Sequence, residues 1–323
     1  MEYRAIGRTD LQVSELCLGT MTFGWGADKE TSFAIMDRAV EGGINFFDTA
    51  DIYSNWIEGN PGGVAEAWIG DWLADRKPDG IVIATKVRGR MWDGPDGEGL
   101  SRTHIMRGVE ESLRRLQIER IDLYQTHWPD DDTPLDETLR ALDDLIQQGK
   151  VRYVGCSNHS AALLKEALRI STEGGLARYE SLQPHYSLVK REEFERELLA
   201  LCEQESIGVI PYSPLGRGFL TGKYRRDQGA PAGSRGATRA DDEIHKFASE
   251  RNFALLDQME AMGKERGATI AQIALAWQLT QPVIASPIVG ATNVAQLEES
   301  LGAVGLRLNE EEMQALDEAS SWR

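Results

Sequence analysis

The chain has 323 residues and a formal net charge of −17, because 52 acidic residues outnumber 35 basic ones. This excess of negative charge argues against nucleic acid and anionic membranes as partners, since both attract clustered positive charge. The three cysteines form no paired metal motif or disulfide framework, and the first residues lack the apolar core of a signal peptide. No apolar run reaches the ~18 residues that a membrane span needs. We therefore expect a cytoplasmic protein without membrane or nucleic-acid partners, and its oligomeric state stays open.

In chain order, the first pattern is a pair of short alternating runs around residues 7–10, which predicts a β-hairpin. Eight short apolar runs follow, and seven of them lead promptly into an amphipathic, helix-like stretch. The runs end near residues 19, 48, 86, 126, 157, 184, 213 and 288. The first six intervals are about 27 to 40 residues long, which is the size of one βα unit.

This rhythm predicts a (β/α)8 TIM barrel in a single domain over residues 1–323. The alternative is a doubly wound open sheet, but residues 18–26 lack the Gly-rich phosphate fingerprint of such a sheet's first turn. The seventh interval is about 75 residues, which predicts a long loop after strand seven. Extra C-terminal helices are also expected, and the last of them begins near Asn309.

Polar residues stand at the ends of consecutive apolar runs, where a barrel builds its active site. The second run ends at Asp48, with Tyr53 in the following loop, the third run ends at Lys86 and the fourth at His127. Each residue alone has an ordinary explanation, such as a turn, packing or a solvated charge. As a set they form an acid, because an ammonium lowers the pKa of a phenol and an imidazole can bond a carbonyl oxygen. Carbonyl reduction needs a group that protonates the developing oxyanion.

Over essentially its whole length the sequence resembles the aldo-keto reductase superfamily. The matching segments, in chain order, are FFDTADIYS, IATK, QTHW, VGCSN, SLQPHYS, PYSPLGRGFLTGK and IVGATNVAQLEES. The resemblance implies that Asp48 pairs with Lys86, that both tune Tyr53 as the general acid, and that His127 orients the substrate carbonyl. It also implies a small-molecule carbonyl substrate and a hydride from a nicotinamide cofactor, NADP(H) or NAD(H).

The resemblance assigns the cofactor contacts to the later strand ends. The residues implied for the nicotinamide are Ser157, Asn158 and Gln183 at the carboxamide, with Tyr212 stacked under the ring. The residues implied for the pyrophosphate are Ser213, Pro214, Leu215, Gly216 and Gly218. The residues implied for the adenosine end are Gly290, Ala291, Thr292, Gln296 and Glu299.

Cofactor preference depends on the region around Thr292. Relatives that prefer NADPH often carry Arg or Lys there to bind the 2′-phosphate, and this sequence has no neighbouring cation. Ser300 is a second departure, because many relatives have Asn at that position. The resemblance therefore favours NADP(H) over NAD(H) with a weakened preference and leaves dual use open. Arginines of the long loop could supply the missing charge; they are Arg225, Arg226 and Arg235.

Tryptophans follow four successive strand ends, at Trp25, Trp56, Trp92 and Trp128. Large indoles often only fill space, but loops at the strand ends of a barrel border its active site. The pattern predicts a broad, mostly apolar substrate pocket with indole N–H donors. Such a pocket suits aromatic aldehydes or sugars better than small, highly charged acids.

Two other functions fit part of the pattern. A Schiff-base aldolase would use Lys86 as its nucleophile, but this leaves Tyr53 and the cofactor segments unexplained. A regulatory binding module could keep the reductase fold, as potassium-channel β subunits do. A metal-dependent hydrolase would need more ligands than Asp48 and His127, so we expect no metal.

Overall fold

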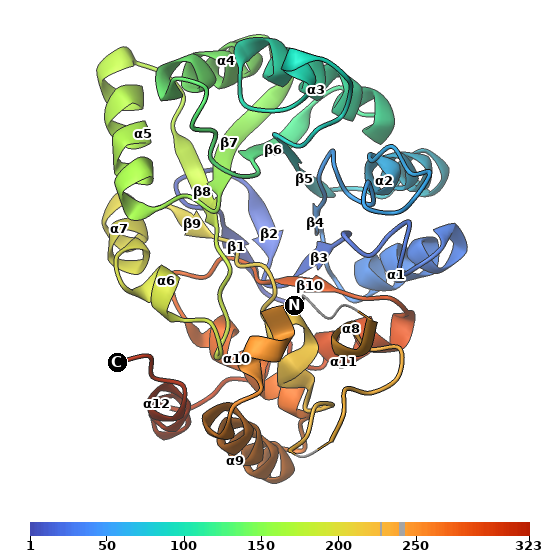
Figure 1. The fold of residues 1–323 in the computed structure, drawn as a ribbon, viewed down its shortest axis with the longest axis vertical. Helices are drawn as coiled ribbons and strands as arrows, with labels where there is room; N and C mark the ends of the chain where they lie inside the picture. Colours follow the sequence, from blue (N-terminus) through green and yellow to red (C-terminus); the bar gives the residue numbers. More distant parts are fainter. Residues whose placement is uncertain (227, 239–242) are drawn as a thin grey trace.

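The computed structural model describes residues 1–226, 228–238 and 243–323. Its central sheet consists of β3 (Cys17–Gly19), β4 (Phe46–Asp48), β5 (Val82–Val87), β6 (Ile121–Thr126), β7 (Val151–Ser157), β8 (Tyr179–Gln183), β9 (Gly208–Val209) and β10 (Ile288–Gly290). All neighbours are parallel, in the order β10-β3-β4-β5-β6-β7-β8-β9. Parallel bridges Val209–Ile284 and Tyr212–Ile288 join the two outer strands, so that the sheet closes into a ring (Figure 1). The predicted (β/α)8 barrel is confirmed.

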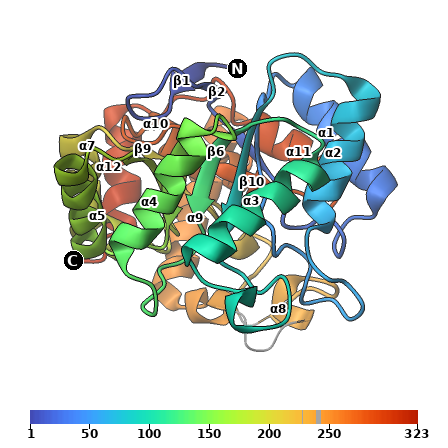
Figure 2. The same ribbon diagram turned by 90° about the horizontal axis from the view of Figure 1, so that it is seen from above.

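The N-terminal hairpin closes one end of the barrel. Strands β1 (Tyr3–Ala5) and β2 (Gln12–Ser14) pair antiparallel. Ile6, Leu11 and Val13 are almost fully buried and share an apolar cluster with the inward-facing side chains of the barrel strands. Figure 2 shows the hairpin at one end of the molecule and α8 (Arg235–Thr238) at the opposite end. The C-terminal ends of the strands are therefore left to form the open mouth.

The other helices surround the sheet, and a larger apolar cluster fills the layer between them and the strands (Figure 1). They are α1 (Lys29–Glu41), α2 (Val64–Arg76), α3 (Arg102–Leu116), α4 (Leu135–Gln147), α5 (Ala161–Gly174), α6 (Glu192–Glu195), α7 (Leu198–Glu205), α9 (Glu250–Arg266), α10 (Ile270–Thr280), α11 (Val294–Leu301) and α12 (Glu310–Ala319). Seven begin after a side chain that caps a free backbone N–H, which fixes where the helix starts. The caps are Asp28, Ser101, Ser160, Ser249, Thr269, Asn293 and Asn309.

The chain between β9 and β10 is more structured than the predicted long loop. It contains two short 3₁₀ helices, Gly216–Thr221 and Glu243–Phe247, as well as α8, α9 and α10. Strand β9 is also shorter than predicted, because Pro211 follows closely and cannot donate a ladder hydrogen bond. The extra C-terminal helix is present as α12.

Close packing of α2 on α3 depends on Gly70. A Cβ atom at this position would lie well inside van der Waals contact with the carbonyl oxygen of Arg115 and with Leu116. Gly70→Ala should therefore lower the free energy of unfolding by about 1–3 kcal/mol, the typical cost of overpacking. Urea unfolding measures this loss. Gly229→Ala is the control, because a Cβ there meets no atom within 4 Å; equal losses in both variants would contradict this explanation.

Candidate active site

Polar side chains from neighbouring strands meet at the mouth of the barrel. Strand β4 ends at Asp48, β5 carries Lys86 one residue before its end, and His127 directly follows β6. The loop after β4 carries Tyr53, and a hydrogen bond from the Ser54 hydroxyl to the carbonyl of Phe23 holds that loop in place. The four residues predicted as a tetrad (Asp48, Tyr53, Lys86 and His127) therefore come together, and each is at most 8% exposed.

The ammonium of Lys86 is the centre of this cluster. Its Nζ donates to Asp48 Oδ1 at 2.6 Å, to the backbone carbonyl of Thr49 at 2.7 Å and to the hydroxyl oxygen of Tyr53 at 2.9 Å. All three ammonium hydrogens are thus used, as a fully buried charge requires. Because the Tyr53 oxygen accepts from Lys86, its own O–H hydrogen stays free to be donated elsewhere.

The Asp48 carboxylate is held at both oxygens. Its Oδ2 accepts from Gln183 Nε2 at 2.9 Å and from Gln125 Nε2 at 3.3 Å, and both amides are buried. The sequence analysis missed Gln125, although it lies two residues before His127, on the strand whose tip was singled out. It assigned Gln183 to the cofactor, whereas the structure directs the Nε2 group of Gln183 to Asp48. Two amide donors therefore fix the orientation of the carboxylate that faces Lys86.

The electrostatics keep the proton on Tyr53. Burial raises the pKa of Tyr53 to about 12, and this effect outweighs the opposing effect of the Lys86 ammonium. The pKa of Lys86 is also raised, because the attraction of Asp48 and Tyr53 for its charge exceeds the penalty of burial. Sequence reasoning considered only the ammonium and expected a lowered phenol pKa. Lys86 is therefore charged and Tyr53 is a neutral phenol at physiological pH.

His127 is a neutral imidazole next to the phenol. Burial is the main cause that holds its pKa well below 6.5, with a further contribution from Lys86. Its ring lies edge-on to Tyr53, with ring centroids 5.9 Å apart, and stacks on Trp128 at 3.7 Å. Within the described part of the chain, the Nδ1 atom has no hydrogen-bond partner. A neutral imidazole in this position can orient a polar ligand atom without adding a second positive charge.

The residues predicted to hold the nicotinamide carboxamide also lie together. The Ser157 hydroxyl donates to the carbonyl of Gln183 at 2.8 Å, and the Asn158 amide donates to the carbonyl of His127 at 2.9 Å. The Tyr212 hydroxyl donates to Asn158 Oδ1 at 3.0 Å, and its ring stacks on that of His185. These bonds pre-organise the surface between the tetrad and β9.

The segment predicted for the pyrophosphate has an unusual backbone. Ser213, Gly216, Arg217 and Gly218 all have positive φ angles, from 54° to 96°. Successive backbone N–H groups in such a segment can form a concave anion site, and glycine allows a ligand to approach closely. Pro214 and Leu215 complete the turn. The donor set fits a pyrophosphate group.

The predicted adenosine end lies where β10 leads into α11. Thr292 donates its backbone N–H and its hydroxyl to Gln296 Oε1, at 2.9 and 3.1 Å. Ala291 accepts from the hydroxyl of Thr22 at 2.6 Å. Gly290 is the last residue of β10, and Glu299 lies in the second turn of α11. These contacts order the segment, and they add no positive charge for a 2′-phosphate.

The arginines proposed to supply that charge have other partners. Arg225 lies 3.2 Å from Glu260, and Arg226 lies 3.0 Å from Glu250 and 2.6 Å from Asp257. All three carboxylates belong to α9. The side chain of Arg235 lies outside the described residues.

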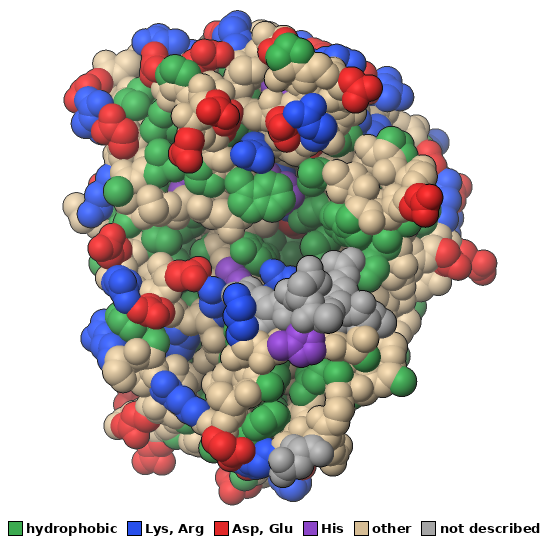
Figure 3. Space-filling view, viewed as in Figure 1, with side chains coloured by type: hydrophobic (Ala, Val, Ile, Leu, Met, Phe, Trp, Pro, Cys, Tyr) green, Lys and Arg blue, Asp and Glu red, His purple; other side chains and the backbone are tan. Residues whose placement is uncertain are grey.

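The structure brings three of the four predicted pocket tryptophans to the mouth. The Trp56 ring lies edge-on to the rings of Tyr53 and Trp25, at 6.4 and 6.3 Å, and Trp128 stacks on His127. Trp56 and Trp128 remain 40% exposed, which is unusual for such large apolar groups. Figure 3 shows a hollow on this face that is lined by hydrophobic side chains.

The fourth tryptophan, Trp92, is not brought together with the others. Its ring stacks on that of His104 at 4.7 Å, and the guanidinium of Arg107 lies 4.0 Å from the ring centroid. Both partners belong to α3. Its position therefore favours the structural explanation, in which the indole packs a loop onto a helix.

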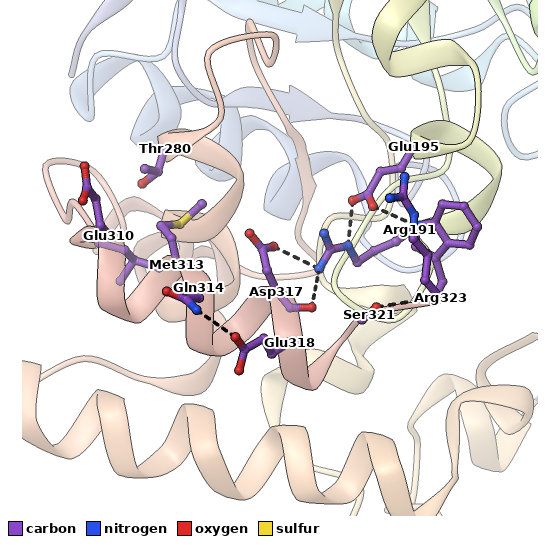
Figure 4. A pocket seen from close by; sticks show the side chains of 12 residues that line it. Arg191, Glu195, Thr280, Glu310, Met313, Gln314, Asp317, Glu318, Ser321 and Arg323 are labelled. Atoms are coloured by element: carbon purple, nitrogen blue, oxygen red, sulfur yellow. Dashed lines mark hydrogen bonds and ion pairs between the residues drawn. The ribbon is translucent and has the colours of Figure 1, made fainter.

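A separate cleft of about 690 Å³ lies beside α12 and the C-terminus (Figure 4). Its charged groups satisfy one another: Arg191 bonds Glu195 at 2.6 Å and Asp317 at 2.9 Å, and the Trp322 indole donates to Glu195 at 2.8 Å. These bonds anchor the C-terminal tail to the outside of the barrel. Among the described residues, no group of three or more His, Cys, Asp or Glu side chains is arranged to hold a metal ion.

Known proteins resemble this chain over nearly its whole length. A model of the aldo/keto reductase family matches residues 15–321. The uncharacterized oxidoreductase YrpG of Bacillus subtilis (strain 168) is 40% identical over 98% of this chain and 95% of its own length. A probable voltage-gated potassium channel subunit beta of Oryza sativa subsp. japonica is 34% identical, with 94% and 91% covered. The protein tas of Escherichia coli (strain K12) is 33% identical, with 96% and 95% covered.

The parallel barrel thus carries a buried cluster of a phenol, an ammonium and a carboxylate at its mouth. The chain belongs to the aldo/keto reductase family. No helix among the residues described is long and apolar enough to cross a membrane.

Asp51 is a buried carboxyl group that sequence reasoning overlooked. Neither of its side-chain oxygens has a hydrogen-bond partner among the described residues, and burial, with a further contribution from Glu66, raises its pKa well above the usual value. An unpaired charge would be costly there. Burial therefore favours the protonated, neutral form of Asp51.

This state predicts a pH-dependent stability difference between Asp51→Asn and the unchanged protein. In the unfolded chain Asp51 ionises above about pH 4, whereas in the folded chain its raised pKa keeps the proton bound. Asp51 therefore lowers the free energy of unfolding more and more as the pH rises toward the pKa of the folded state. The stability gained by Asp51→Asn should therefore grow with pH. Urea unfolding from pH 5 to 8 measures it, with the exposed Asp79→Asn as control. A difference independent of pH would contradict a neutral Asp51.

Proposed function

We propose that this protein is an NAD(P)H-dependent oxidoreductase that interconverts aldehydes or ketones and alcohols. One observation carries the proposal: a buried ammonium, Lys86 Nζ, bridges the Asp48 carboxylate and the Tyr53 hydroxyl. This arrangement leaves a neutral phenol with a free O–H hydrogen and a positive charge directly behind its oxygen. The family and the relative named an oxidoreductase support the same reaction class.

Each residue of the tetrad has its own role in the proposed reduction. Tyr53 donates its proton to the carbonyl oxygen as negative charge develops there. Lys86 stabilises the phenolate that remains, and Asp48 keeps Lys86 charged. His127 orients the carbonyl oxygen toward Tyr53. A reduced nicotinamide, when bound, supplies the hydride to the carbonyl carbon.

The cofactor contacts that we propose follow the order of the strands. Ser157, Asn158 and Tyr212 would hold the nicotinamide, and Gln183 would reach it through its amide oxygen while Nε2 stays on Asp48. Residues 213–218 would bind the pyrophosphate through backbone N–H groups. Residues 290–299 would hold the adenosine end, near the N-terminus of α11.

The electrostatics disfavour the aldolase alternative. A Schiff-base lysine must lose its proton to attack a carbonyl, and enzymes achieve this with a depressed pKa. The pKa of Lys86 is raised, and all its hydrogens are bound. Lys86 is therefore suited to stabilise negative charge and unsuited to act as a nucleophile.

A regulatory role is the second candidate, because several relatives are named as potassium channel β subunits. A binding module could keep the barrel and the cofactor and use neither for turnover. A turnover assay distinguishes the two roles, with reduction of a reactive aldehyde monitored through the loss of NADPH absorbance. An enzyme should show steady turnover, and a binding module should show none.

We also propose a single domain over residues 1–323 and a cytoplasmic location. The three cysteines are free and buried, which suits a reducing compartment.

Tyr53→Phe should reduce turnover of a reactive aldehyde by about 10²-fold or more, because it removes the proton donor. NADPH affinity, measured by fluorescence titration, should stay unchanged. Tyr3→Phe is the control, since its exposed hydroxyl bonds Gly43 beside the hairpin, away from the mouth. Near-normal turnover in Tyr53→Phe would rule out its role as the acid.

We expect NADPH to bind more tightly than NADH, but by less than about 10³-fold, or ~4 kcal/mol. The reason is that no Lys or Arg lies next to Thr292 in the sequence, and that ion pairs hold Arg225 and Arg226. Thr292→Arg should raise the affinity for NADPH and leave that for NADH unchanged, because a phosphate forms charge-assisted bonds with a guanidinium. A wild-type preference above 10³-fold would show that another group binds the 2′-phosphate.

A further inference from the structure

Arg88 is a cation at the mouth that the proposed mechanism does not use. It directly follows β5, two residues after Lys86. The carboxyl ends of the barrel strands form the mouth, so this position puts Arg88 at the same end of the barrel as Lys86 and His127. The charge of Arg88 also makes a small contribution to lowering the pKa of His127. Both observations put its charge at the mouth of the barrel.

The Arg88 guanidinium has no partner within the described part of the chain. It forms no hydrogen bond or ion pair, and its Nε atom is buried without an acceptor. The charge of Arg88 makes a small contribution to lowering the pKa of Asp130, but no ion pair joins the two side chains within the described residues. The oxygens of Asp130 instead accept from the backbone of Leu100 at 2.7 Å, from Thr133 at 2.7 Å and from the backbone of Asp132 at 3.2 Å. A half-buried guanidinium without a direct hydrogen bond or ion pair is unfavourable, which indicates a position available to a ligand.

The backbone at this position is unusual as well. Arg88 has a φ angle of 145°, which residues other than glycine rarely adopt. Its carbonyl accepts from Gly99 at 2.9 Å, which ties the strained turn to the following loop. Strain of this kind persists where the surroundings enforce it, and it concentrates at functional sites.

We propose that Arg88 binds an anionic group of the carbonyl substrate, a carboxylate or a phosphate. The proposal rests on the proposed function and names the substrate class of the same site. Trp56 and Trp128 contact the apolar body of the substrate, Tyr53 and His127 its carbonyl oxygen, and Arg88 its charged end. The preferred substrates are aldehydes or ketones with an apolar body and a negative charge. This reverses the expectation that the pocket disfavours charged acids, although an apolar body is still required.

The test compares matched aldehydes that differ in charge. One pair is 4-carboxybenzaldehyde and its neutral methyl ester; the other is 4-formylphenyl phosphate and 4-methoxybenzaldehyde. The unchanged protein should show at least about a 10-fold higher kcat/KM for the anionic member of one pair. The reason is that the free energy of a charge-assisted hydrogen bond to the anion corresponds to a ratio of this size. The pair with the larger ratio identifies the anion.

Substitution of Arg88 should remove the preference. In Arg88→Gln the ratio of kcat/KM between the anionic and the neutral aldehyde should fall to about one, and Arg88→Lys should restore part of it. Glutamine meets the same backbone strain as arginine, so stability is matched, and thermal unfolding verifies this. Arg90→Gln is the control, because Arg90 is exposed and paired with Glu98; its ratio should equal that of the unchanged protein.

Binding without turnover gives an independent measurement. Benzoate should quench the tryptophan fluorescence of the cofactor-free protein, and Arg88→Gln should weaken its binding about 10-fold, whereas benzamide should bind both proteins equally. Reduction of the neutral aldehydes with no preference for either anion would leave the proposed function intact and overturn the role of Arg88. A loss of NADPH affinity in Arg88→Gln with unchanged aldehyde ratios would also overturn it.

Discussion

The buried ion pair between Lys86 and Asp48 is the interaction on which the site depends. Taking two charges out of water costs several kcal/mol each, and their attraction offsets this only when the geometry is good and every hydrogen-bonding group is satisfied. Here the ammonium uses all its hydrogens, and the carboxylate accepts from Gln125 and Gln183 as well. The barrel meets these conditions because strands β4, β5, β6 and β8 and the loop after β4 bring all the groups to one point. Removing either charge would leave the other buried and unpaired.

The same pair explains why Tyr53 can be a good acid without a lowered pKa. Burial raises the pKa of the phenol to about 12, so the proton is present before the reaction. The oxygen of a reduced carbonyl is a much stronger base than a phenolate, and transfer to it is therefore favourable. In the proposed reduction, Lys86 acts after the transfer, when it faces a phenolate. The ammonium thus stabilises the product of proton transfer more than the resting phenol.

Much of the fold could be predicted, because parallel strands buried on both sides leave a repeating apolar signal. The gathering of the tetrad could be predicted because Asp48, Lys86 and His127 stand at the ends of successive runs and Tyr53 lies in the loop after the first of them. Gln125 was missed because its partner Asp48 lies on another strand, and Asp51 was missed because its burial arises only in the folded loop. The packing of Trp92, and the lack of an acceptor for the Nε atom of Arg88 among the described residues, depend on which loop each side chain packs against, and a linear pattern does not contain that information. The segment after β9 was misjudged because its Gly-rich start masked the helices beyond it.

The net charge of −17 raises a question for a protein proposed to bind an anionic cofactor. At physiological ionic strength, charges interact mainly within about 8 Å, so groups at the mouth matter more than the total. Many surface carboxylates are also paired with arginines, as Glu250 and Asp257 of α9 are with Arg226. The mouth differs, because Arg88 adds positive charge at the end of the barrel that carries the neutral His127, and the Nζ of Lys223 lies next to Gly218 in the segment proposed to bind the pyrophosphate. Lys86 is neutralised by Asp48, so we expect Arg88 and Lys223 to attract anions to this end of the barrel despite the negative net charge.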